Sequence, residues 1–206
     1  MTTLLAITMK TSSFFAYLTR IRWIKRWGLM RNAYHENVME HSWEVATIAH
    51  TLALIKNRYY GGTIDANAIA TAALYHDVTE VLTGDLPTPI KYHSATIEQA
   101  YKHIERQASQ ALINLLPDDL KADFQTLLTD NKLPEEHKQI IKSADKIAAY
   151  LKCQSEIHFG NQEFQTAAEE IFHTIQKSPL PEVHYFMQTF VPACGLTLDC
   201  LMREAT

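Results

Sequence analysis

Hydrophobic positions repeat along the chain every three or four residues, which is the periodicity of amphipathic helices. The clearest helix begins after Asn37, an N-cap residue with Glu40 three places later, and keeps its apolar phase as far as Asn57. Asp65 is positioned to cap a second helix, which we expect to run into His76. Because the periodic segments repeat at three and four rather than at two, the pattern predicts an all-α fold.

Prolines and turn residues separate the remaining predicted elements. Residues 83–89 are not expected to be helical, because each of their two prolines biases the preceding residue toward extended geometry. The other predicted helices span residues 95–116, a shorter segment opened by residues 117–119, a segment from 134 to beyond 151, residues 162–176, and residues 182 to about 202. No internal repeat or linker is evident, so we expect one folded domain.

Composition and charge narrow the class of protein. The 206 residues are 47% hydrophobic and 20% charged, which is typical of a globular chain and excludes a disordered one. A net charge of −4 disfavours nucleic acid as a nonspecific partner. No apolar run approaches the roughly 18 residues that a membrane span needs. Three cysteines without paired spacing predict neither a disulfide framework nor a cysteine zinc site, so we expect a soluble protein of the reducing cytoplasm.

Four residues with metal-binding side chains lie on predicted helices. His41 shares the helix face of Val38 and should point inward. His76 and Asp77 are adjacent where the second helix should end, and Asp145 lies on or beside an apolar helix face. Two imidazoles and two carboxylates from separate helices suit a borderline divalent cation such as Mn²⁺, Co²⁺, Zn²⁺ or Fe²⁺.

Each of these residues also has a purely structural interpretation. His41 could be a core histidine bonded to a backbone carbonyl. The dipeptide at 76–77 could be a solvated pair or a local cap, and Asp145 could form a salt bridge with Lys142 or Lys146. The convergence of all four residues, rather than any one of them, favours a metal site.

Glu80 follows His76 by four residues and Asp77 by three, so it lies on the same side if the helical turn continues. Its carboxyl group could transfer a proton during catalysis. The same spacing also allows Glu80 to accept a hydrogen bond from the free ring nitrogen of His76. The sequence does not separate these two roles.

The ordered set of a histidine, a His-Asp pair and a distant aspartate resembles the HD-domain metal-dependent phosphohydrolases. Longer segments resemble the bacterial 5′-deoxynucleotidases of that superfamily, from Met9 to near the end of the chain. On this resemblance residues 1–8 are an N-terminal extension and residues 9–206 form a single HD domain. The matching segments are Arg26-Trp27, Leu29 to Asn32, Glu36-Asn37-Val38, Glu40-His41-Ser42, Tyr75-His76-Asp77, Glu80 to Pro89, Ala144-Asp145 and Ala149 to Cys153.

The resemblance implies an activity, a cofactor and an assembly. Members of this family remove the 5′-phosphate from deoxyribonucleoside 5′-monophosphates and discriminate against ribonucleotides. They require a divalent metal, for which Co²⁺ often serves best and Mn²⁺ or Zn²⁺ are alternatives, and they are usually homodimers.

The resemblance also implies roles for matched positions. His41, His76, Asp77 and Asp145 take the metal-ligand places. The catalytic positions are Glu80 as acid or base, Arg26 as the residue that orients the phosphate, and Asp77. The substrate-binding positions are Arg26, Trp27, Asp77, Asp85, Leu86, Pro87 and Thr88.

These roles agree with the chemistry of the side chains. Arg26 offers a planar fork of donors for a phosphate, although it could equally be one more solvated cation. The indole of Trp27 could leave no room for a 2′-hydroxyl, or could be a core aromatic residue. Asp85, on a segment stiffened by prolines, could accept the 3′-hydroxyl proton, or could be a turn residue.

Other functions stay open on the sequence alone. One alternative is another HD-superfamily enzyme, which acts on triphosphates or signalling nucleotides or uses two irons as an oxygenase. An oxygenase would be expected to have more inward histidines, and a triphosphate enzyme more basic residues around its phosphate site, which a substrate profile would reveal. A non-catalytic nucleotide-binding protein would be expected to lack a ligand or Glu80, and none of these is missing. A purely structural helical domain would make the coincidence of motifs accidental.

Overall fold

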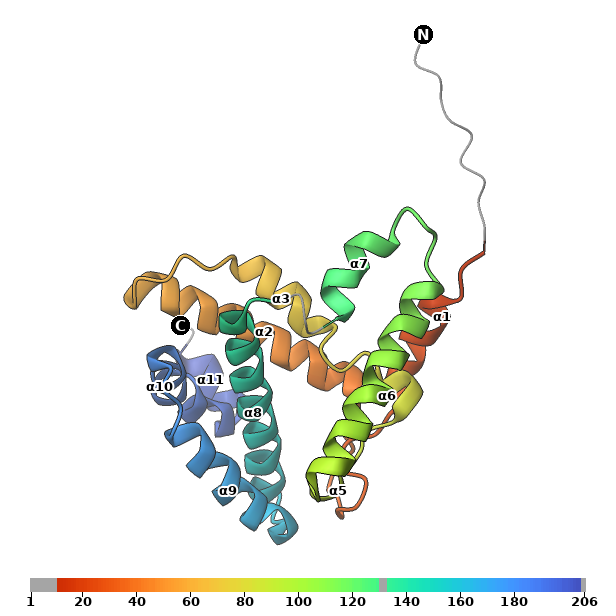
Figure 1. Cartoon of the computed structure of the whole chain (residues 1–206). Helices are drawn as coiled ribbons and strands as arrows, with labels where there is room; N and C mark the ends of the chain where they lie inside the picture. Colours follow the sequence, from red (N-terminus) through yellow and green to blue (C-terminus); the bar gives the residue numbers. More distant parts are fainter. Residues whose placement is uncertain (1–10, 130–132, 205–206) are drawn as a thin grey trace.

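The computed structural model of the protein describes residues 11–129 and 133–204 (Figure 1). In these ranges the chain forms α-helices and short 3₁₀ helices without any β-strand, which confirms the all-α prediction. The helices are α1 (Phe14–Leu18), η1 (Thr19–Trp23), α2 (Val38–Tyr59), α3 (Ala66–Leu74), α4 (Glu80–Thr83), α5 (Thr88–Lys91), α6 (Ala95–Asn114), α7 (Lys121–Leu128), α8 (Glu135–His158), η3 (Gln162–Phe164), α9 (Gln165–Gln176), α10 (Pro181–Thr189), η4 (Val191–Gly195) and α11 (Leu198–Glu204).

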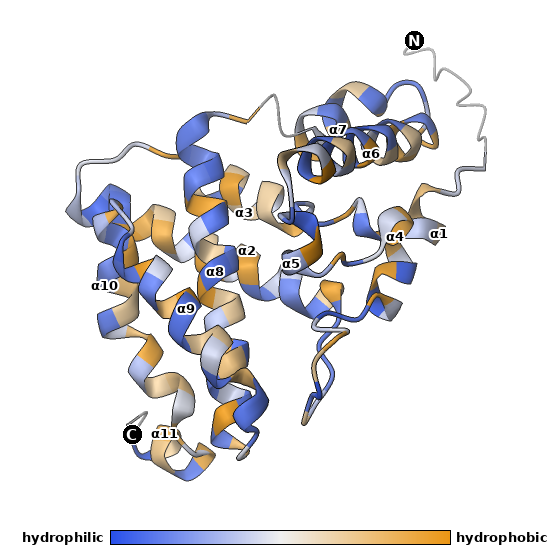
Figure 2. Cartoon of the chain, turned by 60° about the horizontal axis from the view of Figure 1, so that its bottom comes forward, coloured by the Kyte–Doolittle hydropathy of each residue, from blue (hydrophilic) through white to orange (hydrophobic). Residues whose placement is uncertain are grey.

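The long helices α2 and α8 cross at the centre, with α3 packed on α2, and with α9 and α10 on the side away from α6 and α7 (Figure 1). Hydrophobic and hydrophilic residues lie side by side along these helices, as expected for amphipathic elements (Figure 2). The side chains of Val45, Leu52, Ile69, Ile140 and Ile147 at their junction are fully buried. Burying one such side chain stabilises the fold by about 1.5–3 kcal/mol.

Two smaller apolar clusters flank this core and hold segments that reach the candidate site. Phe14 of α1 packs in one cluster with Leu112 of α6 and with Val78, which follows the predicted ligands along the chain. Cys153 of α8 and Phe164 of η3 form the other, against which Trp27 packs. The clusters therefore anchor both loops on which candidate residues lie.

Helix α2 begins where the capping pattern predicts. The Asn37 side chain accepts hydrogen bonds from the backbone N–H groups of Met39 and Glu40 at 3.0 and 3.1 Å, and the Glu40 carboxylate accepts one from the Asn37 N–H. These bonds satisfy donors that a helix N-terminus leaves free. The helix extends to Tyr59, two residues beyond the expected Asn57.

Helix α3 is capped by Asp65 as predicted, through two hydrogen bonds of 3.0 Å from backbone N–H groups of the first turn. The expectation that this helix runs into His76 is wrong, because the helix ends at Leu74 and residues 75–79 form turns before α4 begins. The turns bend the chain so that adjacent side chains at 76 and 77 reach the same site.

The prediction that residues 83–89 are non-helical is wrong at both ends. Thr83 completes α4, and Thr88 and Pro89 begin α5. A proline is tolerated in the first turn of a helix because the N–H that it lacks has no intrahelical partner there. Between these helices Gly84 adopts φ 72°, a left-handed conformation that favours glycine.

The single helix predicted from 182 to about 202 is also wrong. The structure divides it into α10, η4 and α11. Pro192 supplies no N–H to continue an α-helical ladder, and the chain leaves helical geometry after Gly195, where Leu196 is extended.

The other predicted helices are confirmed within a few residues. The helix over 95–116 ends at Asn114, the helix expected from 117–119 begins at Lys121, and the helix from 134 continues to His158. The first turn of the 162–176 segment is the 3₁₀ helix η3. No helix in the described part of the chain combines the length and apolarity that a membrane crossing requires. Residues 1–8, predicted to be an extension, lie outside the described residues.

Candidate active site

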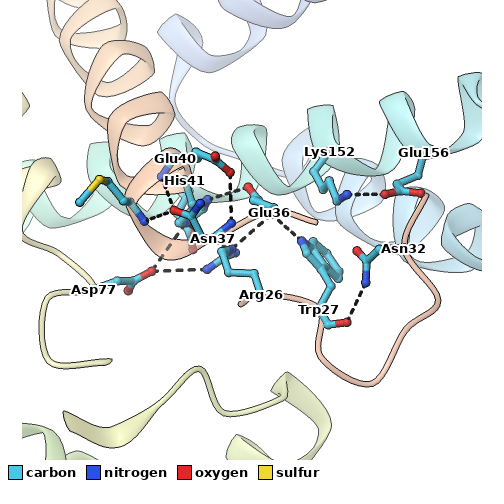
Figure 3. Close-up of polar contacts among 12 residues, drawn as sticks. Arg26, Trp27, Asn32, Glu36, Asn37, Glu40, His41, Asp77, Lys152 and Glu156 are labelled. Carbon is cyan, nitrogen blue, oxygen red and sulfur yellow. Dashed lines mark hydrogen bonds and ion pairs between the residues drawn. The ribbon is translucent and has the colours of Figure 1, made fainter. Parts of the chain in front are cut away.

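Two short segments meet beside the start of α2. Residues 24–27 run antiparallel to residues 36–38, and the backbone N–H of Arg26 donates to the carbonyl of Glu36 at 3.0 Å. The pairing brings Arg26 next to His41, which lies in the first turn of α2 (Figure 3). Residues near the N-terminus of the chain thus reach the site that the predicted ligands form.

His41, His76 and Asp77 lie at the centre of the site. One potential ligand atom from each lies within 4.8 Å of those of the other two. Asp77 Oδ2 is 3.1 Å from His76 Nε2 and 3.6 Å from His41 Nε2. The structure therefore brings together three of the four predicted ligands in one compact group.

The ring of His76 is oriented by the backbone. Its Nδ1 lies 2.7 Å from the carbonyl oxygen of Ala73 and must donate to it, since a carbonyl only accepts. This hydrogen bond leaves Nε2 as the ring nitrogen that faces Asp77. The alternative in which Glu80 holds the ring of His76 is therefore wrong.

Asp145 reaches the same group from α8. Its Oδ1 is 3.0 Å from His41 Nε2 and 4.0 Å from Arg26 Nη2. Because its ion pairs are with His41 and Arg26, the alternative of a salt bridge with Lys142 or Lys146 is wrong. The fourth predicted ligand borders the group on the side of α8.

Arg26 is a buried cation, not a solvated one. Its side chain is 13% exposed, and its Nη1 is 3.4 Å from Asp77 Oδ2. Burial lowers the pKa of Arg26, but the carboxylates of Asp77 and Asp145 outweigh it and raise the pKa above its ordinary value. A permanent positive charge therefore lies beside the predicted ligands.

The charged side chains of this group shift one another's pKa values. Burial lowers the pKa of His41, but contacts with Asp145 and Glu36 outweigh it and raise the pKa to about 9. Burial acts to raise the pKa of Asp77, yet the positive charges of His76 and His41 dominate and lower it. A cation that binds His41 must displace its proton, so its affinity should fall as the pH falls.

Unsatisfied atoms in this group fit a metal ion. Nε2 of His41 and Nε2 of His76 are both buried without a hydrogen bond, and both face Asp77. They lie close to carboxylate oxygens of Asp145 and Asp77 without hydrogen-bond geometry, and a cation would be coordinated by all of these atoms together. A donor set of imidazole nitrogen and carboxylate oxygen suits a borderline divalent ion.

Glu80 begins α4 and is 8% exposed, and its Oε2 makes no hydrogen bond. Burial raises its pKa, and the negative charges of Asp77 and Asp85 raise it further, to about 9. In the protein alone this carboxyl group therefore keeps its proton at neutral pH. Such a group can act as a proton donor.

The predicted nucleotide-pocket residues after Glu80 follow it along one loop. Asp85 is half-buried, and burial raises its pKa. Leu86 and Pro87 are half-buried, and Thr88 is exposed. Side chains of this loop are thus accessible to a ligand, and their contact with a nucleotide stays a prediction.

Trp27 packs against the core and also contacts a residue of the site. One ring edge packs on Phe164, with centroids 5.3 Å apart, while Nε1 donates to Glu36 Oε2 at 2.7 Å. Its φ is 58°, and it is the one non-glycine residue with a positive φ among those described. The side chain is therefore partly a core aromatic and partly a component of the site.

Glu36 is the residue that the sequence analysis left without a role. It is 6% exposed, and it contacts Arg26, Trp27 and His41 (Figure 3). Its position just before the N-cap of α2, within a matching segment, is the only sequence signal. Its burial results from the pairing of two chain segments, which no periodicity indicates.

A cavity of about 1340 Å³ lies elsewhere, between α2, α8, α9, α10 and η4. Glu36 is among its lining residues, whereas His41, His76 and Asp77 are not. The volume of this cavity is therefore not a guide to the candidate active site, which the convergence of side chains identifies.

The helical fold and its His and His-Asp group define the HD-domain phosphohydrolase class. A crystal structure of an HD-domain phosphohydrolase from Listeria innocua is similar with a TM-score of 0.76, at 24% identity over 88% of each chain. The HD phosphohydrolase DatZ of cyanophage S-2L, bound to dA and one catalytic Zn²⁺ ion, has a TM-score of 0.60 at 20% identity and covers 92% of this chain and 100% of its own.

Sequence comparison then gives the family. Residues 13–194 match the 5′-deoxynucleotidase YfbR-like family, and the chain belongs to that family. A 5′-deoxynucleotidase of Vibrio parahaemolyticus is 49% identical over 93% of this chain and 98% of its own length. One from Klebsiella pneumoniae is 48% identical over 96% and 99%. The resemblance noted from the motifs is confirmed.

Proposed function

We propose that the protein hydrolyses the 5′-phosphate of deoxyribonucleoside 5′-monophosphates with the help of a divalent cation. The observation that carries this proposal is the meeting of His41, His76 and Asp77 beside the buried Arg26 and Glu80. The relatives that share almost the whole chain bear the name of this activity. Phosphate-ester hydrolysis needs groups that bind a cation, donors for the phosphate oxygens and a proton donor. The imidazoles, the arginine and the protonated carboxyl group of this site are such groups.

The cation would be held by the two imidazoles and two carboxylates that converge, His41, His76, Asp77 and Asp145. When bound, it supplies charge neutralisation for phosphate oxygens and a water molecule of lowered pKa. The donor set is compatible with Co²⁺, Mn²⁺ or Zn²⁺. We expect Co²⁺ to support the highest activity, and the Zn²⁺ ion of DatZ is consistent with this class of ions.

The chain's own side chains account for binding and proton transfer. Arg26 is fixed beside Asp77, and its outer nitrogens can donate to phosphate oxygens in a bidentate arrangement. Glu80, whose pKa is raised to about 9, can donate a proton to the 5′-oxygen that leaves. Asp77 contributes by orienting Arg26 as well as by binding the cation.

Selectivity for deoxyribose is assigned to Trp27 and the loop after Glu80. The indole, held by Glu36, would lie against the sugar edge and exclude a 2′-hydroxyl. Asp85 would accept the hydrogen bond of the 3′-hydroxyl, while Leu86, Pro87 and Thr88 complete the wall. The half-buried state of Asp85 supports this role, because a buried acceptor gains from a ligand donor.

We further propose a cytoplasmic homodimer. Cys153, Cys194 and Cys200 are free, in keeping with a reducing compartment. Trp43 and Phe159, at the 1340 Å³ cavity, are 66% and 68% exposed, which is unusual for large apolar side chains unless a partner covers them. Light scattering after gel filtration should give twice the mass of the chain, and Trp43→Glu should reduce the measured mass to that of a single chain.

The activity is tested by measuring phosphate release from dAMP and AMP by metal-stripped protein, with and without added Co²⁺, beside an Asp77→Ala control. Release that needs the cation, favours dAMP and is absent in the control supports the proposal. If neither monophosphate is hydrolysed with several divalent metals, the proposed substrate is wrong, and triphosphates and signalling nucleotides are the next substrates to measure.

A further inference from the structure

Glu36 lies between three groups that the proposed function uses for different purposes. Its Oε2 accepts the Trp27 Nε1–H at 2.7 Å and is 3.5 Å from Arg26 Nε. Its Oε1 is 3.6 Å from His41 Nδ1, on the side of the ring opposite to the nitrogen that faces Asp77 (Figure 3). One carboxylate thus contacts Trp27, which is proposed to face the sugar, Arg26, which is proposed to bind the phosphate, and His41, a predicted metal ligand.

The burial of Glu36 makes these contacts obligatory. Its side chain is 7% exposed, and a buried carboxylate without partners is strongly unfavourable. Trp27 donates a hydrogen bond to it, while Arg26 and His41 lie at ion-pair distance and offset its charge, so moving any one of them weakens the compensation of the buried carboxylate. The backbone pairing of Arg26 with Glu36 at 3.0 Å keeps the two residues in register.

The backbone of Trp27 indicates that its position is imposed by its surroundings. A φ of 58° is disfavoured for a bulky side chain, so it persists only where several contacts hold it. These contacts are the hydrogen bond to Glu36, the edge of Phe164 at 5.3 Å, and the hydrogen bonds that the Trp27 carbonyl accepts from the Met30 backbone N–H at 3.0 Å and the Asn32 side-chain amide at 3.2 Å. Of these residues, only Glu36 contacts the polar edge of the indole.

We propose that Glu36 is a positioning residue that fixes the indole of Trp27 and the guanidinium of Arg26 relative to each other, and thereby sets the discrimination between deoxyribonucleotides and ribonucleotides. The inference rests on the proposed function for its substrate. Its structural part, that Glu36 immobilises Trp27, holds independently of any substrate.

Two substitutions separate the contacts of Glu36. Glu36→Gln keeps an oxygen that can accept from Trp27 but removes the charge beside Arg26, whereas Glu36→Ala removes both. We expect Glu36→Ala to lower the ratio of kcat/KM for dAMP over AMP by about tenfold or more. Glu36→Gln should keep that ratio within about twofold but raise KM for both nucleotides, because Arg26 loses its alignment. A merely structural role would lower activity on both substrates equally and leave the ratio unchanged.

A double-mutant cycle tests whether Glu36 acts through the indole. Trp27→Phe keeps the ring face and removes the donor, so it should lose selectivity by a similar factor. The double variant of Trp27→Phe and Glu36→Ala should lose no more selectivity for dAMP over AMP than the more affected single variant, because the two residues act as one unit. Additive losses would overturn the proposal. Glu40→Gln is the matched control, since Glu40 is an exposed glutamate in the first turn of α2, four residues after Glu36, and glutamine preserves the capping box.

A measurement without substrate keeps this inference separable from the proposed function. The chain has three tryptophans, and the other two, Trp23 and Trp43, are 63% and 66% exposed, so replacing both by phenylalanine leaves Trp27 as the single probe. Acrylamide quenching of Trp27 should increase at least about twofold in Glu36→Ala, because the released indole loses its hydrogen bond. Unchanged quenching overturns the proposal. Wild-type protein inactive on dAMP would overturn the proposed function alone, and quenching would still decide whether Glu36 immobilises Trp27.

Discussion

Two clusters of buried charge lie on either side of the segment that leads into α2, and they differ in how their polar atoms are satisfied. In the first, Nε2 of His41 and of His76 have no hydrogen-bond partner. In the second, Lys152 and Glu156 on successive turns of α8 contact each other (Figure 3). Lys152 also donates to the Tyr34 carbonyl at 2.7 Å.

The second cluster is complete within the protein. Glu156 accepts hydrogen bonds from the Ala33 N–H at 2.8 Å and from the Asn161 side chain at 2.7 Å, while the Lys152 ammonium lies 3.5 Å from the centroid of the Tyr34 ring. It joins the segment 31–34 to α8. Buried charge alone therefore does not identify an active site, whereas unsatisfied buried ligand atoms that converge do so. The first cluster should control function and the second stability.

The largest expected effect is on the first cluster. Asp77→Asn should lower cation-dependent phosphate release by at least about 10³-fold, because Asp77 contributes a charge to the cation and to Arg26. Its free energy of unfolding should change by less than the about 3–5 kcal/mol expected for a fully buried pair, since the side chain of Asp77 is 23% exposed. A phosphate-release assay and urea unfolding measure these two quantities, and calorimetric titration measures the affinity for Co²⁺. Unaltered Co²⁺ affinity would contradict the assignment of Asp77.

Glu80→Gln separates proton transfer from cation binding at the first cluster. It should lower kcat by about 10²–10⁴-fold while the affinities for Co²⁺ and dAMP stay near those of the wild type, because the amide keeps the shape but cannot transfer the proton. The pKa of Glu80 is raised to about 9 in the protein without a cation. A cation at Asp77 offsets part of the negative charge that raises it, so wild-type activity should decline with rising pH below that value. A kcat of Glu80→Gln equal to that of the wild type would exclude Glu80 from proton transfer.

Glu156→Gln tests the second cluster. It should lower the free energy of unfolding by about 3–5 kcal/mol, because the buried Lys152 ammonium is left unpaired. The folded fraction should still bind one equivalent of Co²⁺. Glu169→Gln, an exposed glutamate on α9, is the control and should change stability by less than about 0.5 kcal/mol. Loss of Co²⁺ binding by folded Glu156→Gln would contradict the separation of the clusters.

The pH dependence of this pair follows from the same contacts. Burial acts to raise the pKa of Glu156, but the hydrogen bonds from Lys152 and Asn161 outweigh it and lower the pKa to about 2. A carboxylate with a lowered pKa stabilises the fold above its unfolded pKa of 4.5 and loses that contribution as the pH falls toward 2. Acid unfolding curves should therefore show a smaller decline between these values in Glu156→Gln.

The smallest expected effect concerns Glu44, which lines the 1340 Å³ cavity. Burial raises its pKa, and the charge of Glu36 raises it further, to about 7. The unfolded chain releases this proton near pH 4.5, so stability falls as the pH rises from there to about 7. Glu44→Gln should gain about 1 kcal/mol at pH 8 in urea unfolding. The same comparison at pH 4 is the control and should give no gain.

The predictions from sequence succeeded where the signal was local. The capping pair Asn37 and Glu40 determined the start of α2, and with it the inward position of His41. They failed where several short helices take the place of one long helix, as in the C-terminal region around Pro192. Helix periodicity continues through such a break, because the same apolar face serves each piece.

The sequence by itself determined the helical class, the starts of the long helices, and the residue types that resemble a metal-dependent phosphohydrolase, because caps, periodicity and motifs act over a few neighbouring residues. Only the tertiary structure decided that Asp145 contacts His41, that Ala73 orients His76, and that Glu36 is buried among its partners. The reason is physical. The energy of a buried charge depends on which donors surround it, and those donors come from segments that folding alone brings together.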